Sequence, residues 1–140
     1  MSKAEKILVV DDERGIRYLL SDVLSDAGFE VSMARDGQES LDQLEENRFD
    51  LVITDINMPR LDGIEMLKRM KMAGRKEKVI IMTANLLDLK FEEAEVPHVV
   101  TQLQKPFRID SFLNVVIATV KNNKHIPGMG LPQAAASSGF

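Results

Sequence analysis

Five side chains that can take part in phosphate or metal chemistry follow short apolar runs in this sequence. Asp11 and Asp12 come after one run, Asp55 after a second, Thr83 after a third and Lys105 after a fourth. Such runs are typical of buried strands, and a carboxylate at the end of a buried strand is costly unless another group stabilises it. Open α/β sheets bind their ligands at the carboxyl ends of their strands. The recurrence therefore indicates one shared site.

These residue types indicate phosphoryl chemistry supported by a divalent cation. Three carboxylates in one crevice repel one another, and Mg²⁺ relieves that repulsion because it prefers oxygen ligands. A carboxylate can attack phosphorus, so Asp55 is a candidate covalent acceptor. Thr83 offers a hydroxyl to a phosphoryl oxygen, and Lys105 offers a positive charge. Simpler explanations exist for single residues: Asp12 or Glu13 as a helix cap, Thr83 as an ordinary strand end, and Lys105 as a solvated loop residue.

Hydrophobic periodicity predicts the elements that position these residues. Apolar residues recur at helical spacing in several segments, and short apolar runs between them predict strands. Gly28 stands where a helix terminator is expected, and Asp36 can cap a helix. We expect helices at about residues 16–27, 36–47, 64–74 and 109–120, and strands at residues 6–10, 30–34, 51–54, 79–82 and 99–103.

The alternation of strands and helices predicts a doubly wound, flavodoxin-like α/β fold. Five such strands form a parallel sheet covered by helices on both faces. Right-handed crossovers restrict the topology, and the strand order 2-1-3-4-5 is one common solution. That order places the first and third strands side by side. Asp11, Asp12 and Asp55 then converge in the crevice between them.

Length and composition exclude several classes of protein. The chain has 140 residues and a net charge of −4, too acidic for an autonomous nucleic-acid-binding domain. It has no cysteine, which suits a reducing compartment. No apolar run could span a bilayer and no signal peptide opens the sequence, so we expect a cytoplasmic protein. Residues 1–122 are expected to form one domain, and the Pro/Gly/Ala/Ser-rich residues 123–140 a flexible tail or severed linker.

Four segments match, in order, the motifs of a known family. They are I-L-V-V-D-D-E, L-V-I-T-D-I-N-M-P-R-L-D-G, I-I-M-T-A and K-P-F, each at or near the end of a predicted strand. Together they make the chain resemble the CheY-like receiver domain of bacterial two-component and phosphorelay response regulators. The resemblance covers about residues 3–122. It implies a phosphoacceptor signalling module, rather than an enzyme, that changes its affinity for a partner when it is phosphorylated.

The resemblance also implies roles for individual residues. Asp55 matches the aspartate that receives a phosphoryl group from a histidine kinase or phosphotransfer protein. Asp12 matches the direct Mg²⁺ ligand of the acidic pair, and Asp11 a partner that acts largely through water. Asn57 matches the position whose backbone carbonyl completes the metal shell.

Three further positions match the family at the switch. Thr83 corresponds to the switch hydroxyl and Lys105 to the phosphate-contacting lysine. Ala84 corresponds to the small residue that leaves room beside the phosphorylation site.

Two departures from the family concern output. Gln102 occupies the position, three before the lysine, that usually holds an aromatic residue coupled to the switch threonine. Residues 85–98 show no clean helical spacing and include Pro97. We therefore expect a fourth helix that is short, irregular or mobile. The candidate output surface consists of Leu86, Leu87, Leu89 and Gln102.

Other functions compete with this interpretation. A haloacid-dehalogenase-like phosphatase needs a D-x-D motif after the first strand, where this chain has Asp11, Asp12 and Glu13, and it needs room for a cap domain. An FMN carrier needs a phosphate loop there, and acidic residues would repel phosphate. A degenerate receiver acting as a protein-binding scaffold is a third alternative. A receiver itself is either a stand-alone phosphate shuttle or a part cut from a longer transcriptional regulator.

Overall fold

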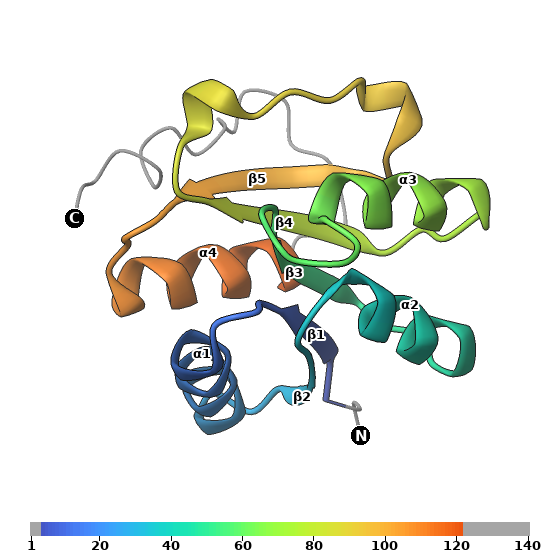
Figure 1. Ribbon diagram of the computed structural model, residues 1–140. Helices are drawn as coiled ribbons and strands as arrows, with labels where there is room; N and C mark the ends of the chain where they lie inside the picture. The colour runs from blue at the N-terminus through green and yellow to red at the C-terminus, as the bar shows by residue number, and fades with distance from the viewer. Residues whose placement is uncertain (1–3, 122–140) are drawn as a thin grey trace.

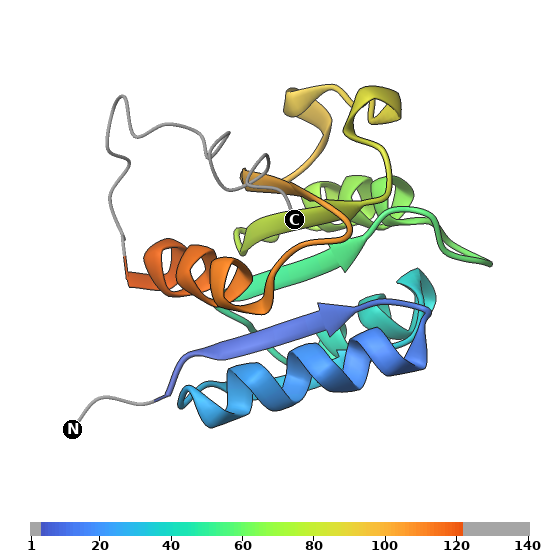
Figure 2. The same cartoon turned by 90° about the vertical axis from the view of Figure 1, so that its left-hand side faces the viewer.

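A five-stranded parallel sheet forms the centre of the molecule (Figure 1). The computed structural model describes residues 4–121. The strand order is β2-β1-β3-β4-β5, as predicted. Figure 2 shows the arrowheads of β1 and β3 pointing the same way, so their carboxyl ends lie at one edge. The strands are β1 (Lys6–Val10), β2 (Glu30–Ala34), β3 (Leu51–Asp55), β4 (Lys78–Thr83) and β5 (Val99–Gln104).

Helices cover both faces of the sheet and enclose two apolar cores. Along β1, Ile7 and Val9 belong to one core, while Leu8 and Val10 belong to the other. This is the period-two alternation of a strand buried on both faces. In the described part of the chain, no helix is both long and apolar enough to cross a membrane. Helices α1 (Arg14–Asp26) and α4 (Ile109–Lys121) cover one face, and α2 (Gly37–Glu46) and α3 (Gly63–Met72) the other.

Local signals fix where the helices begin and end. Asp36 caps α2, because its carboxylate accepts a hydrogen bond of 2.9 Å from the Glu39 amide. Gly28 follows α1 with φ of +100°, a conformation that glycine adopts without a steric penalty. On α1, Tyr18 and Leu19 are each 45% exposed. The apolar row of this helix is therefore wider than the face that packs on the sheet.

The segment between β4 and β5, described throughout, contains two short 3₁₀ turns and no α-helix. The turns are η1 (Leu86–Asp88) and η2 (Glu93–Glu95). Figure 1 shows them as short coils on an extended connection beside β5. Leu89 and Phe91 pack against the core on the α3 side, whereas Leu87 is 88% exposed. The prediction of an irregular fourth helix agrees with this arrangement. The tail predicted at residues 123–140 lies outside the described residues.

A buried ion pair holds the edge of the sheet where β3 and β4 begin. Glu77, whose side chain is 4% exposed, receives a 3.0 Å hydrogen bond from Nε of Arg75 and a second from its Nη2. Arg75 also donates to the backbone carbonyls of Leu44, in the last turn of α2, and of Asn47, its C-cap residue. The Phe49 amide donates to Glu77. Burial alone would raise the pKa of Glu77, but these hydrogen bonds and the Arg75 charge outweigh it and lower the pKa.

This ion pair makes stability depend on pH. A carboxyl with a lowered folded-state pKa contributes stability above its unfolded pKa of about 4.3 and loses it as the pH falls through the folded value. We expect Glu77→Gln to lower the free energy of unfolding by about 2 kcal/mol at pH 7, and the difference from wild type to shrink below about pH 4. Urea denaturation of wild type and variant at pH 7 and again below about pH 4 measures the two differences in the free energy of unfolding. Glu46→Gln, at an exposed position, is the control. A difference that does not change with pH would contradict the assignment.

The irregular segment should also exchange its amide hydrogens quickly. Within the described chain, the amides of residues 90–94 donate no hydrogen bond, whereas β4 is hydrogen-bonded to strands on both sides. We expect amides 90–94 to exchange at least about 1,000-fold faster than those of β4, because core strands exchange only through costly opening. Hydrogen exchange followed by mass spectrometry measures the ratio. Strong protection across residues 90–94 would contradict this account of the segment.

Candidate functional site

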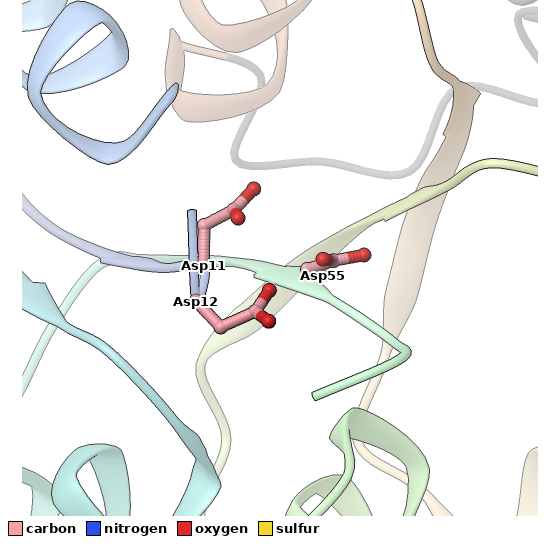
Figure 3. A group of neighbouring side chains, drawn as sticks. All are labelled: Asp11, Asp12 and Asp55. Carbon is pink, nitrogen blue, oxygen red and sulfur yellow. The ribbon is translucent and has the colours of Figure 1, made fainter. Parts of the chain in front are cut away.

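The three predicted aspartates meet at the carboxyl ends of β1 and β3. The register pairs Val10 with Thr54, so the residues that follow, Asp11 and Asp55, lie beside each other. Asp12 comes next on the β1 side. One carboxylate oxygen from each aspartate lies within 4.8 Å of the others, and Figure 3 shows the three side chains at the ends of these neighbouring strands. The predicted convergence of Asp11, Asp12 and Asp55 is therefore present in the structure.

Asp11 is fully buried and organises the start of α1. One of its carboxylate oxygens accepts a 2.9 Å hydrogen bond from the Glu13 amide. Its backbone amide donates to Ala34 at the end of β2 and its carbonyl accepts from Arg17. Glu13 occupies the N-cap position of α1 without a side-chain capping bond. Asp12 is exposed and makes no capping bond either, so helix capping does not explain the acidic pair.

Lys105 supplies the positive charge of the crevice. Its ammonium lies 2.8 Å from Oδ2 of Asp11, 3.4 Å from Oδ2 of Asp55 and 3.8 Å from Oε1 of Glu13. The backbone amide of Lys105 donates to the Thr83 carbonyl over 2.7 Å, which fixes the end of β5 against β4. Burial alone would lower the pKa of Lys105, but the hydrogen bond and charge of Asp11, together with Asp55, outweigh burial and raise the pKa. Lys105 is thus a charged member of the site, not a solvated loop residue.

Asp55 is buried among these groups, but part of it still reaches the surface. It is 7% exposed, and its Oδ1 accepts a 2.8 Å hydrogen bond from the Ile56 amide. Burial raises the pKa of the Asp55 carboxyl, Asp11 acts in the same direction, and Lys105 and the Ile56 amide oppose the shift. Its other oxygen, Oδ2, lies 3.4 Å from the Lys105 ammonium. Hydrogen bonding to one oxygen and the Lys105 contact to the other therefore orient this carboxylate within the cluster.

The remaining predicted residues surround this group. Asn57 is exposed on the loop after β3, and Ala84 is exposed after β4. Thr83 is buried, and its hydroxyl accepts a 3.2 Å hydrogen bond from the Asn85 amide. Gln102 is partly buried on β5.

Sequence reasoning missed two residues near the site. Glu13 reaches Lys105, as given above. Gln104 accepts a 3.2 Å hydrogen bond from the Leu86 amide and so ties β5 to η1. Glu13 is recognisable in hindsight as the third consecutive acidic residue after β1. No sequence pattern points to Gln104, because its contact with Leu86 depends on the path that the chain takes between β4 and β5.

The donor set suits a hard divalent cation. All the candidate side-chain ligands are carboxylate oxygens, the ligand type that Mg²⁺ prefers. Asp12 is exposed, so the cluster opens to solvent and leaves room for the waters that Mg²⁺ retains. Three carboxylates face one ammonium, which leaves negative charge to be neutralised. The residues present therefore fit a bound Mg²⁺.

The chain is similar to known signalling proteins. A family model described as the response regulator receiver domain matches residues 7–117. Sporulation initiation phosphotransferase F of Bacillus subtilis (strain 168) is 44% identical over 113 residues, which are 80% of this chain and 90% of that protein. Response regulator MprA of Mycobacterium bovis (strain BCG / Pasteur 1173P2) is 32% identical over 133 residues. Those residues are 95% of this chain but 55% of MprA.

Solved structures are similar over nearly the whole fold. The chemotaxis response regulator CheY4 of Vibrio cholerae has a TM-score of 0.75 and 33% identity, covering 84% of this chain and 99% of that one. The receiver domain of the Francisella response regulator 1452 has a TM-score of 0.73 and 30% identity, covering 86% of this chain and 99% of that one. The predicted resemblance and fold are both confirmed.

Gly63 packs so closely against the backbone of Asp55 and Ile56 that there is no room for a larger side chain. Its amide donates to the Ile56 carbonyl over 2.8 Å, and a Cβ there would collide with the Asp55 carbonyl oxygen and lie 3.0 Å from Ile56 Cα. We expect Gly63→Ala to lower the free energy of unfolding by about 1–3 kcal/mol, because backbone atoms must move. Chemical denaturation measures the loss. The matched control is Gly15→Ala in α1, where a Cβ meets open space; equal effects of the two variants would contradict the close approach.

Proposed function

This chain belongs to the family of response regulator receiver domains, and from that membership we propose that Asp55 accepts a phosphoryl group from a phosphohistidine donor. The observation that carries the proposal is the position of the Asp55 carboxylate, which shares one crevice with two further aspartates and Lys105. The donor is a sensor histidine kinase or a phosphotransfer protein. The module assists its own phosphorylation and does not turn over a separate substrate as an enzyme does.

The transfer exchanges one bond to phosphorus for another. A carboxylate oxygen of Asp55 forms a bond to phosphorus while the bond from phosphorus to the donor's imidazole nitrogen breaks. The electron pair of that bond stays on the imidazole, which takes up a proton. Lys105 lies close enough to Asp55 to contact an oxygen of the transferred group, and its positive charge stabilises the negative charge there.

Mg²⁺ is the proposed cofactor of this transfer. Asp12, Asp55 and the backbone carbonyl of Asn57 would hold it directly, with Asp11 acting through water. When bound, the cation neutralises negative charge on the transferring phosphoryl oxygens. Asp11 meanwhile keeps Lys105 in place through their 2.8 Å contact.

Phosphorylation is proposed to alter partner binding through the β4–β5 segment. The Thr83 hydroxyl, now bonded to the Asn85 amide, would turn toward a phosphoryl oxygen, with Ala84 leaving room for it. The candidate output surface remains Leu86, Leu87, Leu89 and Gln102, of which Leu87 is the most exposed. The output partner is a protein, and neither direct nucleic-acid binding nor membrane binding by this domain is proposed.

The receiver could act in either of two kinds of protein, a stand-alone shuttle or a longer regulator. The chain matches 90% of the Bacillus subtilis relative but 55% or less of the MprA proteins. A stand-alone phosphate shuttle and a receiver within a longer regulator are both compatible with these relatives. The proposed location is the cytoplasm, which the cysteine-free composition suits. A scaffold without phosphoryl chemistry is the alternative of another class, and the joint presence of Asp12, Asp55 and Lys105 argues against it.

Incubation with acetyl phosphate, with and without Mg²⁺, tests the proposal. We expect a phosphoryl adduct on the intact wild-type protein that needs Mg²⁺ and is lost in base, as an acyl phosphate should be. Asp55→Asn should form no adduct and keep its fold. Asp12→Ala should form the adduct at least about tenfold more slowly at limiting Mg²⁺, because loss of a metal ligand weakens binding. Mass spectrometry of intact protein measures the adduct, and circular dichroism checks the fold.

Asp22→Asn, an exposed position on α1, is the control for loss of one carboxylate and should behave as wild type. Uptake of phosphate by Asp55→Asn at the wild-type rate would refute the assignment of the acceptor. A wild-type protein that neither forms an adduct nor binds Mg²⁺ in a calorimetric titration would favour the scaffold alternative.

A further inference from the structure

The loop between β3 and α3 (residues 56–62) contains a strained turn. The Gly63 amide closes the loop at its base by donating to Ile56 over 2.8 Å. At its tip the Leu61 amide donates to the Pro59 carbonyl over 2.8 Å, around Arg60 with φ of +68°. A three-residue turn with positive φ at its centre is the rare, strained form of the γ-turn. Such a conformation at a residue other than glycine persists only where surrounding contacts hold it.

The beginning of α2 provides those contacts. Asp36 is 3% exposed, and while one of its carboxylate oxygens caps α2, the other accepts a hydrogen bond from the Arg60 guanidinium. Beside it, the Gly37 amide donates to the Leu61 carbonyl over 3.2 Å. A Cβ at residue 37 would lie 2.5 Å from that same oxygen, so the approach requires glycine. The tip of the loop is thus joined to α2 by an ion pair and a backbone hydrogen bond.

We propose that the Asp36–Arg60 pair is a latch that positions the backbone carbonyl of Asn57 for the divalent cation. This inference rests on the proposed Mg²⁺ site. Asp12 and Asp55 project from or beside strand ends, whereas Asn57 lies on the loop. The orientation of the Asn57 carbonyl therefore depends on what fixes that loop. Arg60 acts through the loop backbone and is a positioning residue, with Asp36 as its anchor on α2.

Electrostatics and positioning predict opposite effects when Arg60 is replaced. Removal of a positive charge near a cation site strengthens cation binding if only charge matters. Loss of the latch weakens binding, because the loop carbonyl is no longer held in place. A weaker Mg²⁺ affinity after removal of the guanidinium is therefore a readout that charge alone cannot produce.

The variants are chosen to leave the backbone and the helix cap intact. Asn adopts positive φ more readily than most residues, so Arg60→Asn removes the guanidinium without adding strain. Asp36→Asn keeps an oxygen that can accept the capping bond from Glu39. We expect Arg60→Asn to raise the Mg²⁺ dissociation constant about threefold to tenfold and Arg60→Lys to restore part of the affinity. Calorimetric titration of the unphosphorylated protein with MgCl₂ measures each constant.

A double-mutant cycle decides whether the two residues act as a pair. If they do, Asp36→Asn combined with Arg60→Asn weakens binding by less than the product of the single effects. Arg69→Gln on α3 removes one charge from an exposed ion pair with Glu65 and should not weaken binding. Unchanged or tighter binding by Arg60→Asn, or effects that multiply fully, would overturn the latch. Absence of Mg²⁺ binding by the wild type would overturn the proposed metal site itself, and the role of the latch with it.

Discussion

The crowding of three carboxylates around one ammonium is the constraint on which the rest of the structure depends. Asp11 and Asp55 are withdrawn from water, where like charges repel strongly. Lys105 compensates part of that charge, and it can do so only because β5 ends at the same edge of the sheet as β1 and β3. The parallel sheet and its strand order are thus what allow these charges to share one crevice. The charge left uncompensated is what suits this cluster of carboxylates to the proposed cation.

The same arrangement connects the crevice to a distant part of the chain. Lys105 bonds through its backbone to Thr83 and through its side chain to Asp11. Gln104, its neighbour, accepts from the Leu86 amide. A change in charge beside Lys105 therefore acts on a residue whose backbone is hydrogen-bonded to the end of β4 and whose neighbour, Gln104, is hydrogen-bonded to the start of η1. Together with the hydrogen bond from the Asn85 amide to the Thr83 hydroxyl, these contacts connect the carboxylates to the segment between β4 and β5.

Sequence patterns predicted the features that depend on burial, and missed those that depend on loop paths. Runs such as the one ending at Asp55 predicted the strands, because a strand buried on both faces must be apolar throughout. The alternation with helices and the right-handed crossovers then gave the strand order as one common solution, and that order predicted the convergence of the aspartates. The absence of helical spacing before β5 predicted the irregular segment. The pairs Arg60–Asp36 and Arg75–Glu77 had no such signal. Each needs a particular backbone turn to bring an arginine to a carboxylate, and periodicity carries no information about turns.

A firmly held loop and a loosely held segment follow the carboxyl ends of two neighbouring parallel strands, β3 and β4. β3 is buried along its whole length and ends in the acidic crevice. Its loop is fastened to α2 and closed by Gly63, so few of its groups are free to move. The segment after β4, in contrast, has 3₁₀ turns and amides at residues 90–94 that bond to no described residue. Chemistry needs ligands held in fixed positions, whereas a change in partner binding needs an element with little to lose on rearrangement. The proposed phosphoryl transfer uses the first at β3, and the proposed change in partner binding uses the second between β4 and β5. Thr83 and Lys105 lie where the two regions meet.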